Sequence, residues 1–257
     1  MEGVAGRLAG KVAIVTGSTS GIGKGTAQMM AREGARVTVT GRNAAQGEAV
    51  VASIREAGGE AIFVQADITQ ADACRRLVEE TEKAFGGLDI LVNNAAIFLR
   101  GRIDTTSEAL WDEIMTVNLK APFLCCQAAV PAMRRRGGGA IINIGSVNAY
   151  IGGPDLLAYS ASKGGLMTFT KNLAAALAKE RIRVNLVNPG WVLTEGEHRV
   201  QLAQGRPENW AEIAAAQQPF GRLLRPDDIA YAIVYLASDE AELVSGAVLT
   251  VNQVPVN

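Results

Sequence analysis

Apolar positions along the chain form short β-branched runs that alternate with longer stretches of helical spacing. The first run, residues 12–16, precedes a glycine-rich turn and a helical pattern that ends at Gly34. Further strand-like runs lie at 36–40, 61–66 and 88–92, before Ser146, and at 182–187 and 247–251. Helical patterns separate them at 44–57, 70–85, 107–136, 158–180 and 226–236. This order predicts an α/β fold with a doubly wound parallel sheet and helices on both faces.

No break in composition divides the chain, so residues 1–257 are expected to form a single domain. Residues of about 194–221 differ from the rest because they are polar and follow the end of a strand. This segment is predicted to be an inserted helical flap that contacts the substrate.

Composition narrows the class of protein. The 25 basic and 26 acidic residues leave a net charge of −1, which gives no electrostatic support for binding nucleic acid or a membrane surface. No apolar run reaches the roughly 20 residues of a membrane helix, and Met1 to Leu8 has no features of a signal peptide. Three cysteines, two of them adjacent, fit neither a disulfide framework nor a metal site. A metal-free protein of the reducing cytoplasm is expected.

The first strand–turn–helix unit is arranged to bind a phosphate. Backbone N–H groups of such a turn, together with the helix N-terminus, favour an anion. Because the spacing is Gly-x-x-x-Gly-x-Gly and glycine also serves tight turns, the turn alone is weak evidence for a Rossmann-type dinucleotide site. The residues concerned are Gly17, Ser18, Thr19, Ser20, Gly21, Ile22 and Gly23.

Residues after the next strands bear on the choice of cofactor. The second strand ends at Gly41, Arg42 and Asn43, and no acidic residue lies between Arg36 and Gly47. Arginine here suits a ribose 2′-phosphate, so NADP is favoured over NAD, although a solvated loop charge is the alternative. Asp67, followed by Ile68, is either an adenine contact or a turn residue. Asn94 follows the fourth strand, where an amide holds backbone or cofactor.

A proton-transfer site is predicted where Ser146 ends a strand and Tyr159 and Lys163 begin a helix. Four residues apart, Tyr159 and Lys163 lie on one side of that helix. An ammonium beside a phenol favours the phenolate, which makes a tyrosine usable as an acid/base group. Asn118 interrupts an apolar helix face, so it is either a satisfied structural amide or part of this polar site.

Taken together, these motifs resemble the short-chain dehydrogenase/reductases of the classical type along essentially the whole chain. The resemblance rests on Thr16 to Gly23, Asn93-Asn94-Ala95, Asn118, Ser146, Tyr159-x-x-x-Lys163 and Pro189-Gly190. Ala96 stands where the family usually has glycine, a change that should be tolerated.

The resemblance implies roles for these residues in hydride transfer between a nicotinamide cofactor and a secondary alcohol or ketone. Tyr159 would be the general acid/base, Lys163 would lower its pKa and bind the nicotinamide ribose, and Ser146 would polarise the carbonyl. Asn118 would hold a water in a proton relay. The glycine turn would cradle the pyrophosphate, Val192 and Thr194 would face the nicotinamide carboxamide, and Pro189 and Gly190 would also bind the cofactor.

Two functions of other classes remain as alternatives. A serine hydrolase is disfavoured because Ser146 lacks the Gly-x-Ser-x-Gly context and the only histidine is His198 in the flap. A non-catalytic NADP-sensing protein would be expected to have lost Ser146, Tyr159 or Lys163, and all three are present.

Substrate and assembly are the least determined features. Asn148, Tyr150, Trp191, Glu195 and His198 are the candidate substrate contacts, and they suggest a sugar, sugar acid or polyol. A 3-oxoacyl thioester or another apolar ketone is the alternative, and solvated helix positions are an equal explanation for Glu195 and His198. Apolar surface on the helices at 107–136 and 158–180, together with the resemblance, predicts a homotetramer.

Overall fold

Seven strands lie side by side in one parallel sheet. A computed structural model describes residues 6–256. The prediction that Met1 to Leu8 is not a signal peptide therefore lies partly outside the described residues. The sheet order is β3-β2-β1-β4-β5-β6-β7, and every neighbouring pair is parallel. The strands are β1 (Val12–Val15), β2 (Arg36–Gly41), β3 (Glu60–Gln65), β4 (Ile90–Asn93), β5 (Gly139–Ile144), β6 (Ile182–Pro189) and β7 (Val248–Val251). The predicted doubly wound sheet is confirmed.

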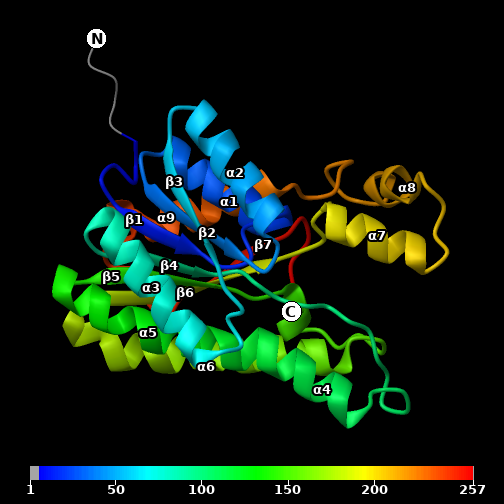
Figure 1. Ribbon diagram of the computed structural model, residues 1–257. Coiled ribbons are helices and arrows are strands. Elements are labelled where there is room, and N and C mark those ends of the chain that lie inside the picture. The colour runs from blue at the N-terminus through cyan, green and yellow to red at the C-terminus, as the bar shows by residue number, and fades with distance from the viewer. Residues whose placement is uncertain (1–5, 257) are drawn as a thin grey trace.

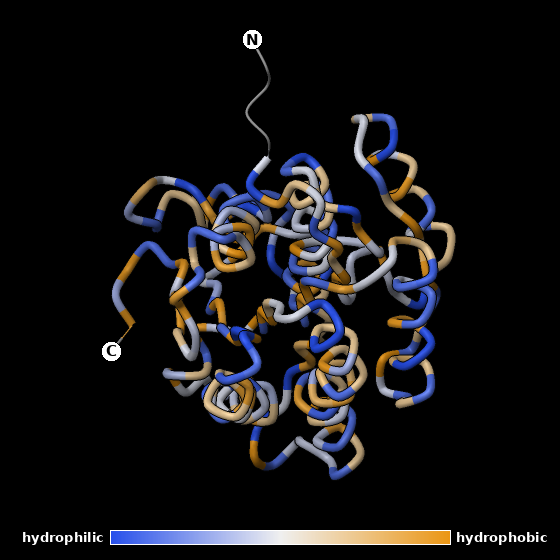
Figure 2. Tube along the Cα trace, turned by 90° about the vertical axis from the view of Figure 1, so that its left-hand side faces the viewer, coloured by the Kyte–Doolittle hydropathy of each residue, from blue (hydrophilic) through white to orange (hydrophobic). Residues whose placement is uncertain are grey.

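Helices cover both faces of this sheet (Figure 1). One layer holds α1 (Gly21–Arg32), α2 (Ala44–Glu56) and α9 (Pro226–Ala237), and the other holds α3 (Ala71–Phe85), α5 (Ala121–Arg136) and α6 (Leu157–Leu177). Each layer has its own cluster of buried apolar side chains against the sheet. Figure 2 shows apolar and polar positions alternating along the helices, the pattern of helices with one buried face. Short helical turns are η2 (Val147–Ala149), η3 (Ala178–Glu180) and η4 (Asp239–Ala241).

The single helix predicted over 107–136 is interrupted. The structure has α4 (Glu108–Met115), a π-helical turn η1 (Thr116–Lys120) and then α5. Asn118 lies in this turn and is fully buried. Its Oδ1 accepts from Ile97 N at 2.9 Å, while Nδ2 donates to Ile97 O at 2.8 Å and to Ser162 Oγ at 3.1 Å. The amide thus ties the helix to the chain after β4, a contact that helical periodicity does not reveal.

The segment after β6 forms two helices, α7 (Glu195–Ala203) and α8 (Trp210–Ala216), which project beyond the strand ends (Figure 1). Helix α8 and the loops that flank the two helices form a small apolar cluster of their own. It contains Trp210, Ala214 and Leu223, with Trp191 and Ala211 packed against it. The segment is therefore held partly by its own core and forms one wall above the sheet.

Within residues 6–256, no helix is both long and apolar enough to cross a membrane. In the same part of the chain, no group of three or more His, Cys, Asp or Glu side chains is placed to hold a metal ion.

Candidate active site

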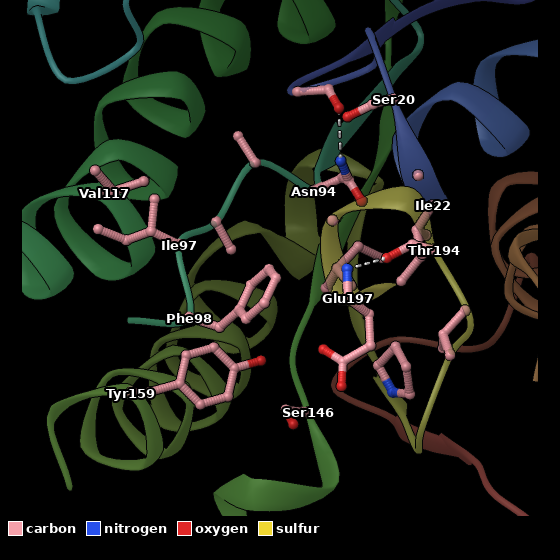
Figure 3. Close-up of a pocket in the computed structure, with 18 of the residues that line it drawn as sticks. Ser20, Ile22, Asn94, Ile97, Phe98, Val117, Ser146, Tyr159, Thr194 and Glu197 are labelled. Carbon is pink, nitrogen blue, oxygen red and sulfur yellow. Dashed lines mark hydrogen bonds between the residues drawn. The ribbon is translucent and has the colours of Figure 1, made fainter. Parts of the chain in front are cut away.

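A cleft of about 830 Å³ opens at the carboxyl ends of the strands. The turn after β1, the ends of β2, β4, β5 and β6, and helix α7 contribute to its lining. It lies where the strand order reverses between β1 and β4, the place at which parallel α/β sheets bind ligands. Figure 3 shows the side chains that face it, including Ser20, Asn94, Ser146, Tyr159, Thr194 and Glu197.

The glycine turn forms one end of the cleft. Gly17 and Gly21 have φ angles of +62° and +55°, conformations that favour glycine. A Cβ on Gly23 would collide with the carbonyl of Gly17 and the amide of Asn94. The Asn94 Nδ2 donates to Thr16 O at 2.8 Å and to Gly17 O at 3.2 Å, which fixes the turn. The turn and the N-terminus of α1 therefore fit a pyrophosphate group.

Most of the residues predicted to bind a cofactor line this cleft. They are Gly17, Thr19, Ser20, Gly21, Ile22, Arg42, Asp67, Ile68, Asn94, Pro189, Gly190, Val192 and Thr194. Three predicted residues do not line it. Gly23 lies behind the turn, Ser18 is fully buried with its hydroxyl donating to Val15 O at 2.6 Å, and the Asn43 side chain caps α2. Ser18 is placed to join the ends of β1 and β2, because its hydroxyl also accepts from Thr40 N at 2.9 Å, whereas Asn43 stabilises the start of α2.

Arg42 and Asp67 form the other end of the cleft. Asp67 Oδ1 accepts from Thr69 Oγ1 at 2.7 Å and Thr69 N at 3.1 Å, the arrangement of a turn aspartate. These bonds lower the pKa of Asp67, and the charge of Arg42 adds to the effect. Among residues 6–256, no hydrogen bond or ion pair engages the exposed Arg42 guanidinium. The guanidinium is thus available to an anion in the cleft.

Ser146 lies at the end of β5, where several amides orient it. Its N–H donates to Asn188 Oδ1 at 2.8 Å. Its Oγ accepts from Asn148 N at 3.1 Å and from Asn148 Nδ2 at 3.2 Å. A hydroxyl has two acceptor positions and one proton to donate. Since Asn148 occupies both acceptor positions, the Ser146 proton is directed to another oxygen.

Tyr159 and Lys163 project from the first turns of α6. Lys163 is 2% exposed, and its Nζ donates to Ile144 O at 2.7 Å. Burial lowers the pKa of Lys163 to about 8. The pKa of Tyr159 is raised, first by burial, while hydrogen bonding to Ser146 opposes the rise and the charge of Glu197 adds to it. Lys163 Nζ lies 5.8 Å from the centroid of the Tyr159 ring, and a lowering of the Tyr159 pKa by its charge stays a prediction.

Only two of the five candidate substrate contacts line the cleft. Asn148 and Trp191 line the cleft, whereas Tyr150, Glu195 and His198 are not part of its lining. His198 Nδ1 instead accepts from Trp210 Nε1 at 3.0 Å, which braces α7 against α8. Asn118 also lies outside the lining, and its side chain is committed to the protein contacts described above. A water relay through Asn118 therefore stays a prediction.

Glu197 is a cleft residue that the sequence-based list omits. Thr194 caps α7 by accepting from Glu197 N at 3.1 Å, but the Glu197 carboxylate does not return to the cap. It accepts instead from Trp191 Nε1 at 2.8 Å. In Figure 3 the carboxylate and the Tyr159 hydroxyl point toward each other across the cleft. The Thr-x-x-Glu pattern at 194–197 was the available signal, since it places a glutamate in the first turn of a helix beside the strand end.

Comparisons with known proteins show which family the chain matches. Residues 17–253 match a family described as enoyl-(acyl carrier protein) reductase. The chain is 38% identical to a cis-4-hydroxycyclohexanecarboxylate dehydrogenase of Sinomonas cyclohexanicum, covering 95% of this chain and 96% of the relative. It is also 38% identical to an NADP-dependent (R)-specific alcohol dehydrogenase of Lentilactobacillus kefiri, covering 96% of each.

Among solved structures, a dehydrogenase/reductase from Sinorhizobium meliloti superposes with a TM-score of 0.85 at 40% identity, over 95% of this chain and 94% of that one. Members of this family are oxidoreductases that use a nicotinamide cofactor, and the glycine turn and strand-end cleft fit one. The chain belongs to the classical short-chain dehydrogenase/reductase family.

Proposed function

We propose that this protein interconverts a secondary alcohol and a ketone by hydride transfer with a nicotinamide cofactor. The observation that carries the proposal is that Ser146, Tyr159 and Lys163 line the same cleft as the glycine turn. The cofactor would lie along the strand ends, with its pyrophosphate at Gly17 to Gly23 and its nicotinamide near Val192 and Thr194. When bound, the nicotinamide ring accepts or supplies the hydride.

The side chains of this protein handle the proton. In the direction of ketone reduction, the Tyr159 hydroxyl gives its proton to the substrate oxygen, and in the direction of oxidation the phenolate takes it back. Ser146 donates a hydrogen bond to the same oxygen, because Asn148 fills its acceptor positions. The Lys163 ammonium supplies positive charge on the same helix. A pair of hydrogen-bond donors aimed at one oxygen thus polarises the carbonyl.

NADP is proposed as the preferred cofactor. Arg42 lines the adenosine end of the cleft, and its guanidinium, which no group of residues 6–256 binds, suits a 2′-phosphate. The relative from Lentilactobacillus kefiri is named as NADP-dependent. Asp67 is acidic and lies nearby, but its Oδ1 is occupied by Thr69.

A sugar, sugar acid or polyol is proposed as the substrate. Polar and charged side chains face the cleft from several elements, namely Arg100, Glu113, Asn148, Glu197, Gln201 and Arg206. The relative from Sinomonas is named for a hydroxylated ring acid. A 3-oxoacyl thioester is the second candidate, because a relative of Staphylococcus aureus that is 36% identical over 94% of this chain is named a 3-oxoacyl-[acyl-carrier-protein] reductase.

Two measurements on the purified full-length protein test the proposal. Titration with NADPH and NADH, followed by nicotinamide fluorescence, establishes cofactor binding and preference. Turnover is then measured at saturating cofactor on a panel of polyols, sugars, simple ketones and 3-oxoacyl thioesters. Oxidation of polyols supports the proposed substrate class, and turnover of thioesters alone supports the alternative. Cofactor binding without turnover of any member would favour an NADP-sensing protein.

Assembly and location complete the proposal. Phe123 of α5 is 45% exposed and makes an edge contact with Phe169 of α6 at 6.5 Å, which leaves apolar surface for a second copy. Cys125 and Ala129 of the same helix are buried within one chain and add nothing to this surface. A homotetramer is proposed, and a monomeric mass by light scattering at micromolar concentration would disprove it. The buried free cysteines at 74, 125 and 126 suit the reducing cytoplasm.

A further inference from the structure

The Glu197 carboxylate occupies an unusual place for a charged group. It lies in the half-buried wall of the cleft, opposite the Tyr159 hydroxyl, and its charge acts on the pKa of that tyrosine. Among residues 6–256, no lysine or arginine forms an ion pair with it. A carboxylate at the reacting end of a cleft, with no ion pair to any side chain of residues 6–256, calls for hydrogen-bond donors.

Protein groups satisfy only one of its two oxygens. Oε1 accepts from Trp191 Nε1 at 2.8 Å and from Gln201 Nε2 at 2.5 Å. Within the described residues 6–256, Oε2 has no protein donor. Trp191 is itself held by stacking on Trp210, with ring centroids 5.7 Å apart and planes inclined by 23°. The carboxylate is thus fixed in position through one oxygen, and the other stays available.

A second acceptor near Glu197 also lacks a hydrogen-bond partner within the described part of the chain, residues 6–256. Gln201 is 3% exposed and lines the same cleft, and its Oε1 is buried without a hydrogen bond. The amide nitrogen of Gln201 donates to Glu197, so the amide oxygen of Gln201 is a second acceptor in this wall. This wall of the cleft is therefore rich in acceptors, whereas Ser146 and Tyr159 opposite provide donors for a carbonyl oxygen.

From this arrangement we infer that Glu197 is a specificity-determining residue that selects substrates with a second hydroxyl beside the reacting carbon. The inference rests on the proposed function and assigns substrate recognition to the Glu197 carboxylate. Ser146 and Tyr159 hold the reacting oxygen, while the Glu197 Oε2 accepts from the neighbouring hydroxyl. A mono-alcohol leaves Oε2 of the carboxylate desolvated and without a donor, and sites built in this way discriminate strongly against the analogue that lacks the hydroxyl.

A matched pair of substrates and a matched pair of variants test it. The substrates are a cyclohexane diol with adjacent hydroxyls and cyclohexanol, which differ by one hydroxyl. For each of them, kcat/KM of oxidation is measured at saturating cofactor with the wild-type protein, Glu197→Gln and Glu195→Gln. Glu195 is exposed on the same helix and lies outside the cleft, so its variant removes an equal charge. Glutamine at 197 keeps the shape and an acceptor but removes the charge.

The wild-type protein should prefer the diol by at least tenfold in kcat/KM. Glu197→Gln should lower the ratio of kcat/KM for the diol to that for cyclohexanol about tenfold, because the charge-assisted bond to the second hydroxyl is weakened, whereas any change in the acidity of Tyr159 acts on both alcohols alike. Glu195→Gln should change neither value. Equal losses on both alcohols, or no change in their ratio, would overturn the inference.

Two further readouts separate this inference from the proposed function. Cofactor affinity by nicotinamide fluorescence should be the same in all three proteins, and a wild-type protein that binds neither cofactor would defeat the proposed function itself. If neither alcohol is oxidised, the diol is titrated into the cofactor-loaded protein while tryptophan emission is followed, since Trp191 contacts Glu197. Saturable quenching in the wild-type protein that is absent in Glu197→Gln supports the inference, and its absence in both overturns it.

Discussion

Replacing Arg42 with alanine isolates the adenosine end of the cleft. The guanidinium has no protein partner among residues 6–256, so its removal breaks no bond within the fold. The backbone stays in place because Gln65 Nε2 donates to Arg42 O at 2.8 Å, a bond that alanine retains. Any loss of affinity therefore reports a contact with the cofactor rather than a rearranged loop.

The expected magnitude follows from the exposure of the side chain. A hydrogen bond to a charged group contributes about 1.5–3 kcal/mol, and an exposed site takes the lower end of this range. About 1.4 kcal/mol corresponds to a tenfold change in affinity. Arg42→Ala should therefore raise the Kd for NADPH about tenfold and leave that for NADH nearly unchanged, since NADH lacks the 2′-phosphate.

Fluorescence titration of both cofactors at one ionic strength provides the assay, because surface charge effects are screened by salt. Arg32→Ala is the matched control, since Arg32 is exposed in the last turn of α1, outside the cleft, and its removal changes the net charge equally. A Kd that rises equally for both cofactors would show a general charge effect. No change for either would make Arg42 a solvated loop charge and favour NAD.

Three other perturbations probe the proton-transfer groups. Tyr159→Phe should reduce turnover by at least a hundredfold with cofactor affinity unchanged, and retained turnover would assign the proton to another group. Glu197→Gln should move the pH dependence of alcohol oxidation to lower pH, because the Glu197 charge raises the pKa of Tyr159; an unchanged profile would contradict that coupling. The pKa of Lys163 is lowered on folding from 10.5 to about 8, so the folded protein binds fewer protons between these values and its stability rises with pH. In urea unfolding, the wild-type protein should gain up to about 3 kcal/mol over Lys163→Met from pH 8 to pH 10.5, and a constant difference would place Lys163 in water.

The sequence by itself determined the layers of this protein. Buried parallel strands need continuous apolar runs, and crossover helices need one apolar face. Both patterns can therefore be recognised from neighbouring residues in the sequence. The glycine turn and the Tyr159–Lys163 spacing are also local, and they predicted which strand ends would carry the site. Element ends differed by one or two residues, as for β3 and β4, because hydrogen bonding rather than composition fixes them.

Only the tertiary structure decided which polar side chains face the cleft. Glu195 and Glu197 are the same residue type in the same helical turn, so the sequence does not distinguish them. Two residues along a helix rotate the side chain by about 200°, and only Glu197 faces the cleft. The π-helical turn at Asn118 depends on bonds to Ile97, and the place of His198 depends on Trp210. Such contacts join residues that are distant in the sequence, and no periodic pattern of apolar positions predicts them. Periodicity thus predicts where the chain is buried, and packing decides what a buried polar group meets.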